Sequence, residues 1–153
     1  MEENLYEQRI DISTLNNAVI NIRNEIGKVI VGQGKMIDLL LIALLSDGHV
    51  LIEGVPGVAK TLTSKLLAKI IDTNFSRIQF TPDLMPSDVL GTSVFNPKQA
   101  EFEFKRGPIF SDIILLDAIN RAPAKPQSAL IEVMEARRIP MDGLPTHLDF
   151  PFL

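Results

Sequence analysis

A glycine-rich turn that ends in Lys-Thr governs the topology expected of this sequence. The turn is Gly54-Val55-Pro56-Gly57-Val58-Ala59-Lys60-Thr61, and it follows the apolar run His49-Val50-Leu51-Ile52-Glu53. A helical pattern of apolar residues begins directly after it, at Leu62. Strand, glycine-rich turn, Lys-Thr and helix together make up a phosphate-binding P-loop. The order therefore predicts an α/β fold; the alternative is an ordinary tight turn that caps a helix.

The residue types in this turn suit an anion. Glycines allow backbone N–H groups to turn inward and approach phosphate oxygens closely, and the following helix directs its positive end at the anion. Lys60 would neutralise the β- and γ-phosphates, and the Thr61 hydroxyl would ligate Mg²⁺. The strict motif carries glycine where this chain has Ala59. Alanine is tolerable there at negative φ and costly at positive φ.

Composition excludes several classes of protein. A chain of 153 residues that is 46% hydrophobic and 22% charged fits one soluble domain with a real core. Its net charge of -4 offers no basic field for nucleic acid. The absence of cysteine excludes disulfides and thiolate metal sites and fits a reducing cytoplasm. The acidic N-terminus is unlike a signal peptide, and the longest apolar run, Met36 to Leu45, is too short to span a bilayer.

Apolar periodicity predicts alternating helices and strands. A first helix carries one apolar stripe with Ser13 or Thr14 as its cap, and a second, over 35–45, is apolar enough for burial on more than one side. The stripe consists of Leu15, Val19, Ile22, Ile26 and Val29. The remaining expected elements are a strand over 77–80, a hairpin with arms at 94–95 and 102–104, a buried parallel strand over 113–116, a helix over 128–137, and two short extended segments around Asp142-Gly143.

A second chemical signal is an apolar strand that ends in a carboxylate. The sequence is Ile113-Ile114-Leu115-Leu116-Asp117, which matches a Walker B pattern. In open α/β sheets ligands bind at the carboxyl ends of the strands, so Asp117 could hold Mg²⁺ directly or through water. Alone, such a carboxylate is better explained as the cap of the next turn. Its position downstream of Lys60 favours the metal site.

With these two motifs and their flanking segments, the chain resembles the MoxR family of AAA+ ATPases from Ile30 onward. The resemblance is carried by Val31-Gly32-Gln33, Gly54 to Thr61, Gln79-Phe80-Thr81-Pro82-Asp83-Leu84-Met85-Pro86-Ser87-Asp88, Gly107-Pro108-Ile109-Phe110, Ile119-Asn120-Arg121-Ala122-Pro123-Ala124-Lys125 and Gln127-Ser128-Ala129-Leu130. The long string that begins at Gln79 is far more specific than a bare P-loop. The family commonly carries Ala-Lys-Thr, which accounts for Ala59.

The resemblance implies a P-loop three-layer sandwich with a parallel sheet and an inserted β-hairpin. It implies an N-terminal helical region over 1–30 and a P-loop α/β core over 31–153, both within the N-terminal part of the ATPase module. The insertion opens at residues 79–84 and contains the hairpin around Phe95 and Phe104; such insertions face the ring pore or a partner. The alternative is a solvated loop, and the spacing of Phe102 and Phe104 suits simple packing equally well.

The resemblance also implies a site for ATP or ADP with Mg²⁺. Catalytic roles fall on Lys60 and Asp117, and metal ligation on Thr61 and Asp117. Val31 and Gly32 match the segment that borders the adenine, although a plain helix break explains them equally well. The nucleotide-binding loop comprises Gly54, Val55, Pro56, Gly57, Val58, Ala59, Lys60, Thr61 and Leu62.

Two departures from the family pattern stand out. The family has Asp-Glu-Ile-Asn-Arg where this chain has Asp117-Ala118-Ile119-Asn120-Arg121, so the glutamate expected to activate water is replaced by Ala118. The change is either a deliberate trap or a degenerate natural copy, and Glu53, Asp83 and Asp88 are the carboxylates nearby in sequence. The second departure is that the sequence stops at Leu153, before the sensor strand, the arginine finger and the lid that the fold is expected to include.

We therefore expect a cytoplasmic, ATP-binding member of the family whose hydrolysis is impaired. Members couple ATP hydrolysis to chaperone-like remodelling or maturation of partners, often von Willebrand A-type proteins, and form homo-oligomeric rings, hexamers by family. Neither a nucleic-acid partner nor a membrane span is expected. A kinase or GTPase on the same loop is a weaker alternative, since no Asn-Lys-x-Asp string reads guanine. A non-catalytic nucleotide-binding interaction module is the other alternative, and Ala118 favours it.

Overall fold

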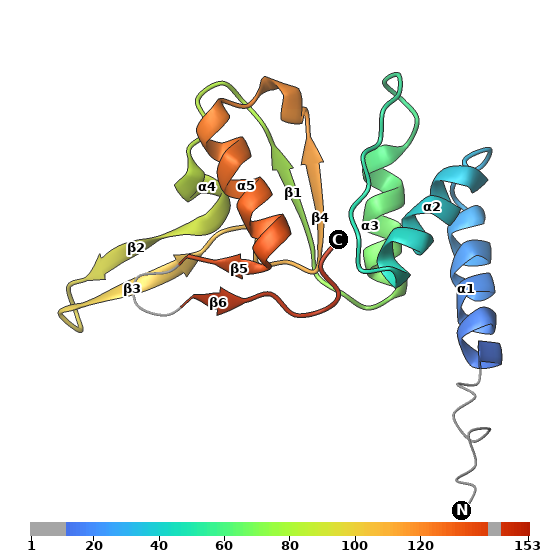
Figure 1. Ribbon diagram of the computed structural model, residues 1–153, viewed down its shortest axis with the longest axis horizontal. Helices are drawn as coiled ribbons and strands as arrows, with labels where there is room; N and C mark the ends of the chain where they lie inside the picture. The colour runs from blue at the N-terminus through green and yellow to red at the C-terminus, as the bar shows by residue number, and fades with distance from the viewer. Residues whose placement is uncertain (1–11, 141–144) are drawn as a thin grey trace, which may run out of the picture.

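The computed structural model describes residues 12–140 and 145–153 (Figure 1). In chain order its elements are α1 (Ile12–Gly27), α2 (Gly34–Leu45), α3 (Lys60–Ile70), β1 (Phe75–Gln79), α4 (Pro86–Leu90), β2 (Gly91–Asn96), β3 (Glu101–Arg106), β4 (Ile113–Asp117), the 3-10 turn η1 (Ile119–Arg121), α5 (Ala124–Ala136), β5 (Arg138–Ile139) and β6 (Thr146–His147). None of the helices within the two described ranges is long and apolar enough to cross a membrane.

The central sheet is a parallel pair formed by β1 and β4. Their register runs from Phe75 opposite Ile113 to Gln79 opposite Asp117. This confirms the predicted parallel strand over 113–116, which extends one residue further to Asp117. The strand predicted over 77–80 lies instead over 75–79, and the Phe80 N–H continues the pairing by donating to the carbonyl oxygen of Asp117 at 2.9 Å.

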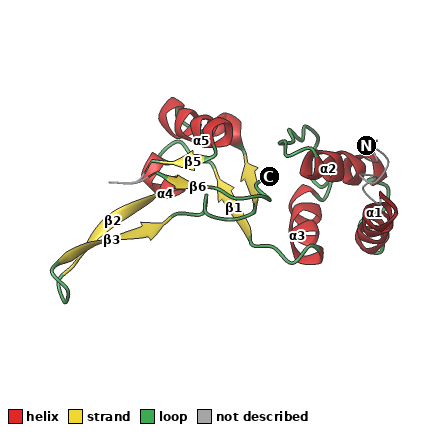
Figure 2. Ribbon diagram, turned by 60° about the horizontal axis from the view of Figure 1, so that its bottom comes forward, coloured by secondary structure: helices red, strands yellow, loops and turns green. Residues whose placement is uncertain are grey.

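Side chains of this strand pair point alternately to its two faces. On one face Ile78, Ile114 and Leu116 pack in a core with Leu130 and Val133 of α5. The other face carries Arg77, Leu115 and Asp117, because side chains alternate along a strand and paired residues share a face. Helix α3 contacts both strands, so helices flank the parallel pair, as the predicted α/β class requires (Figure 2).

The strand predicted before the P-loop is not formed. Residues 49–53 belong to no helix or strand, and within the described ranges they make no backbone hydrogen bond to a neighbouring strand. The free edge of β4 is met by Leu153 instead. Its N–H donates to Asp112 O and its carbonyl accepts from Ile114 N, both at 2.9 Å. The C-terminal residue thus lies between β4 and α3 (Figure 1), at the edge of β4 that β1 leaves free.

Helices α1 and α2 form a second core with α3. It consists of Ile26, Ile30, Ile37, Leu40, Leu41 and Leu67. The prediction that α2 is buried on more than one side was wrong. Leu39, Ile42 and Leu45 on its other face are 48%, 60% and 52% exposed. The predicted cap of α1 was also wrong, since Ser13 and Thr14 lie inside a helix that already includes Ile12. Val29 lies beyond the end of α1 and is exposed.

The predicted hairpin is confirmed and is longer than expected. Strands β2 and β3 pair antiparallel from Gly91 opposite Arg106 to Asn96 opposite Glu101. The rings of Phe95 and Phe102 meet edge to face near the tip, 5.4 Å apart. In both ribbon views the hairpin extends away from the parallel pair (Figures 1 and 2).

The C-terminal elements return the chain toward the N-terminal helices. Helix α5 begins at Ala124, four residues before the predicted start, and the two predicted extended segments are the antiparallel strands β5 and β6. The predicted turn at Asp142-Gly143 lies outside the described residues. Arg137 joins the two parts of the chain, since its Nη1 lies 2.7 Å from Asp47 Oδ1 and its Nη2 donates to the Asp47 carbonyl at 2.7 Å.

Candidate functional site

The glycine-rich turn leads directly into α3. Lys60 and Thr61 are the first two residues of this 11-residue helix, whose first N–H groups have no partner within the helix. Gly57 has a φ of 93° and Ala59 a φ of 56°, so the chain passes twice through the left-handed region before the helix starts. The sequence left the sign of φ at Ala59 open. It is positive, at an intrinsic cost of about 1 kcal/mol for a residue with a Cβ.

The Lys60 side chain folds back over the turn. Its Nζ donates to the carbonyl oxygen of Gly54 at 3.3 Å, which holds the ammonium group across the loop. Thr61 is exposed on the first turn of α3. The first turn of α3 therefore carries an ammonium group, a hydroxyl and N–H groups without intrahelical partners, which is the donor set that a phosphate group requires.

Asp117 is the last residue of β4 and faces the same side of the sheet as Arg77. Its Oδ2 accepts a hydrogen bond from Arg77 Nη2 and forms an ion pair with that guanidinium. The hydrogen bond from Arg77 lowers the pKa of Asp117 below its ordinary value, and the positive charge of Lys60 acts in the same direction. Asp117 therefore carries negative charge at neutral pH beside the loop that carries Lys60.

The position after Asp117 holds no acid. Ala118 has a φ of 56° and precedes η1. Two of the carboxylates considered as substitutes are engaged locally. Asp88 Oδ2 accepts from the Met85 N–H at 2.8 Å at the start of α4, and a hydrogen bond from Thr81 lowers the pKa of the exposed Asp83. Neither of these contacts directs a carboxylate at Asp117.

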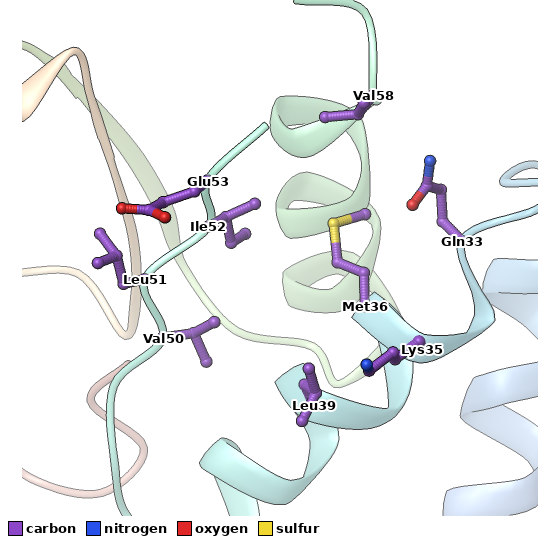
Figure 3. A pocket seen from close by; sticks show the side chains of 9 residues that line it. All are labelled: Gln33, Lys35, Met36, Leu39, Val50, Leu51, Ile52, Glu53 and Val58. Atoms are coloured by element: carbon purple, nitrogen blue, oxygen red, sulfur yellow. The ribbon is translucent and has the colours of Figure 1, made fainter. Parts of the chain in front are cut away.

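A pocket of about 290 Å³ lies between α2 and the segment that leads into the P-loop (Figure 3). Its lining comprises Gln33, Lys35, Met36, Leu39, Val50, Leu51, Ile52, Glu53 and Val58. Met36 of α2 and Ile52 of the preceding segment lie on its two sides. Of the residues predicted to bind nucleotide, Val58 lines it; Val31 is 86% exposed and Gly32, at φ 79°, lies one residue before the lining residue Gln33.

The donor set suits a phosphate-bound divalent cation better than a metal held by protein alone. In the two described ranges no three His, Cys, Asp or Glu side chains gather in a group that could hold a metal. Thr61 and Asp117 supply one hydroxyl and one carboxylate, both oxygen donors of the kind that Mg²⁺ prefers. Mg²⁺ is typically held by one or two such ligands together with substrate phosphates and water.

Two parts of this site were not predicted from the sequence. Arg77 was assigned only to a strand, although its place two residues before Gln79 sets it on the face of Asp117 once the strands pair in parallel. The wall of the pocket that Met36 and Leu39 supply was expected to be buried core. A polar residue in an otherwise apolar strand was the available signal for Arg77.

The chain matches known proteins along most of its length. Residues 49–153 match the model of the ATPase family associated with various cellular activities (AAA). Chaperone MoxR1 of Mycobacterium tuberculosis is 46% identical over 143 residues, which cover 94% of this chain and 37% of that protein. The uncharacterized protein YeaC of Bacillus subtilis is 52% identical over 127 residues, covering 83% of this chain and 40% of that protein.

A solved structure is similar as well. The crystal structure of a protein from Cytophaga hutchinsonii, assigned as an ATPase, matches with a TM-score of 0.75 at 48% identity. The match covers 93% of this chain and 45% of that one. The chain thus spans less than half the length of the relatives that it matches.

Proposed function

Because this chain belongs to the MoxR family of AAA+ ATPases, we propose that it binds ATP or ADP with Mg²⁺ at residues 54–61. The observation that carries the proposal is the placement of Lys60 and Thr61. Both open α3 directly after a turn with two left-handed residues, and α3 contacts β4, the strand that ends at Asp117. This combination offers positive charge to the phosphates and oxygen ligands to the metal.

Each residue has a definite role in this proposal. Lys60 exchanges the carbonyl of Gly54 for the β- and γ-phosphate oxygens, a stronger, charge-assisted contact. The first N–H groups of α3 donate to the same phosphates. Thr61 and Asp117 orient the metal-bound phosphate from two sides. Bound Mg²⁺ supplies positive charge that stabilises the phosphate oxygens during transfer.

The adenine is proposed to lie beside the pocket between α2 and the P-loop. Gln33 and Val58 line that pocket, and Val31 and Gly32 immediately precede Gln33. Apolar walls such as those of Met36 and Ile52 suit the faces of a flat aromatic base, with a few polar groups to orient it.

We further propose that hydrolysis by this chain is impaired. Ala118 cannot accept a proton, and a general base typically contributes roughly 10²- to 10⁴-fold in rate. Nucleotide and metal binding use other residues, so binding can persist. The same observation favours a second candidate, a non-catalytic interaction module in which nucleotide is a structural ligand.

For a protein of its relatives' length we propose a chaperone-like role. The relative named Chaperone MoxR1 and the family match support nucleotide-driven remodelling of partner proteins by an oligomeric ring. That this ring is a homo-oligomeric hexamer in the cytoplasm is proposed from the family resemblance alone. A von Willebrand A-type partner is proposed from the family resemblance alone.

Calorimetric titration with ADP in the presence of Mg²⁺ tests nucleotide binding. Substituting Lys60→Ala removes a charged hydrogen-bond donor, and such contacts contribute about 1.5–3 kcal/mol, so we expect affinity to fall roughly 10- to 100-fold. Lys65→Ala is the matched control, because Lys65 is an exposed lysine further along the same helix. Equal affinities of the two variants, or no binding by the unaltered protein, would refute the assignment.

A further inference from the structure

The guanidinium of Arg77 engages one oxygen of Asp117, the carboxylate that we propose as a metal ligand. Arg77 pairs in register with Leu115, two residues before Asp117, so both side chains stand on one face of the parallel pair. The Nη2 of Arg77 bonds Oδ2 of Asp117. The side chains are 45% and 41% exposed, so they are open to exchange with a ligand in solution.

The two cations near Asp117 are engaged differently. Arg77 forms an ion pair with the Asp117 carboxylate, whereas Lys60 donates to the carbonyl oxygen of Gly54. Lys60 acquires a new anionic partner when phosphate binds. Arg77 lies on β1, which pairs with the edge of β4 opposite Leu153, and its ion-pair partner is Asp117. Asp117 is therefore the group for which Arg77 and a divalent cation compete.

We propose that Arg77 is a positioning residue that holds Asp117 before nucleotide binds and lowers the affinity of the site for the divalent cation. The inference rests on the proposed nucleotide function, and concerns how strongly Mg²⁺ tightens nucleotide binding. Arg77 must release or share an oxygen of Asp117 before both carboxylate oxygens are available as ligands.

The size of the effect follows from exposure. Half-exposed ion pairs contribute up to about 1 kcal/mol, which corresponds to roughly fivefold in an equilibrium constant. Removing Arg77 should therefore strengthen the metal's contribution about two- to fivefold. Lysine keeps the charge but lacks the planar fork of donors, so Arg77→Lys should give a smaller increase than Arg77→Met.

The test measures ADP affinity by calorimetry twice, in EDTA and in saturating Mg²⁺. The dissociation constant in EDTA divided by that in Mg²⁺ reports how much the metal tightens binding. This ratio does not depend on turnover. We expect the ratio to be two- to fivefold larger in Arg77→Met than in the unaltered protein. Arg138→Met is the matched control, because Arg138 is an exposed arginine on β5, and its ratio should be unchanged.

A second background keeps the test decisive. In Asp117→Asn there is no carboxylate at position 117 for which Arg77 and the divalent cation could compete. Adding Arg77→Met to this variant should therefore leave the ratio of dissociation constants unchanged. A ratio that is unaltered or smaller in Arg77→Met, with far-UV circular dichroism confirming a folded protein, would overturn the competition. An unaltered protein that binds no ADP would instead refute the proposed function itself.

Discussion

Substituting Gly107→Ala tests whether the base of the hairpin is fixed by close backbone contact. A Cβ at this position would lie 2.3 Å from Val89 O, 2.6 Å from Gly91 N and 2.7 Å from Leu90 C. All three are backbone atoms, so no side-chain rotation can relieve the overlap. Gly107 N also donates to Leu90 O, and Ile109 N to Val89 O, each at 3.2 Å.

The expected cost is similar whichever way the structure relieves the overlap. Overpacking with intact hydrogen bonds costs about 1–3 kcal/mol, and separating the segments loses two hydrogen bonds that contribute about 0.5–1.5 kcal/mol each. We expect a loss near 2 kcal/mol, which lowers the melting temperature by roughly 4–8 °C in a protein of this size.

The assay is urea denaturation and thermal melting followed by far-UV circular dichroism. Gly34→Ala is the matched control, since a Cβ added at Gly34 would have nothing within 4 Å and the residue starts α2. That substitution should be neutral or stabilise by up to about 1 kcal/mol, because it restricts the unfolded chain. Equal stability of Gly107→Ala and the unaltered protein would refute the close contact of Gly107 with residues 89–91.

Two further predictions concern pH and turnover. Burial lowers the pKa of His49 below 6.5 in the folded protein. As pH falls, the unfolded state therefore binds the His49 proton before the folded state does, and stability should decline below about pH 6.5. His49→Gln should lessen this loss, and urea midpoints at about pH 7.5 and 5.5 measure it. In a protein of the relatives' full length, Ala118→Glu should raise phosphate release at saturating ATP by roughly 10²-fold or more, whereas Ala118→Gln, which has no proton acceptor, should not.

Local patterns predicted most of the elements. The apolar run over 113–116 gave a parallel strand, and the alternation around Phe95 and Phe102 gave a hairpin. Both depend on contacts that the pattern itself encodes. The run over 49–53 has the same apolar character, yet a strand also needs an edge to pair with, and no local pattern reports where that edge lies.

Backbone conformation at the site was less predictable. Ala59 and Ala118 both adopt positive φ, although alanine seldom does. The sign of φ could not be predicted at either residue, because the conformation is imposed by the entry of the chain into α3 and η1 rather than by the side chain. The ion pair of Arg77 with Asp117 was unpredictable for a related reason, since it depends on the register between two strands far apart in sequence.

The two halves of the proposed site belong to different cores, which makes the contacts between these cores important for function. Lys60 opens α3, which packs in the N-terminal core, whereas Asp117 ends a strand of the other. Phe152 is buried in the core formed around β1, β4 and α5, and Leu153 packs against the N-terminal core while bonding to the edge of β4.

The same junction is reinforced by the residues just before the P-loop segment. The Arg137 guanidinium binds both the carboxylate and the backbone carbonyl of Asp47. The ring of His49 meets that of Phe152 edge to face, with the ring centroids 5.6 Å apart. These contacts are made where no strand pairing joins residues 49–53 to β4. The placement of Lys60 relative to Asp117, and with it the geometry offered to a metal-bound phosphate, therefore depends on the side chains of this junction as well as on the P-loop itself.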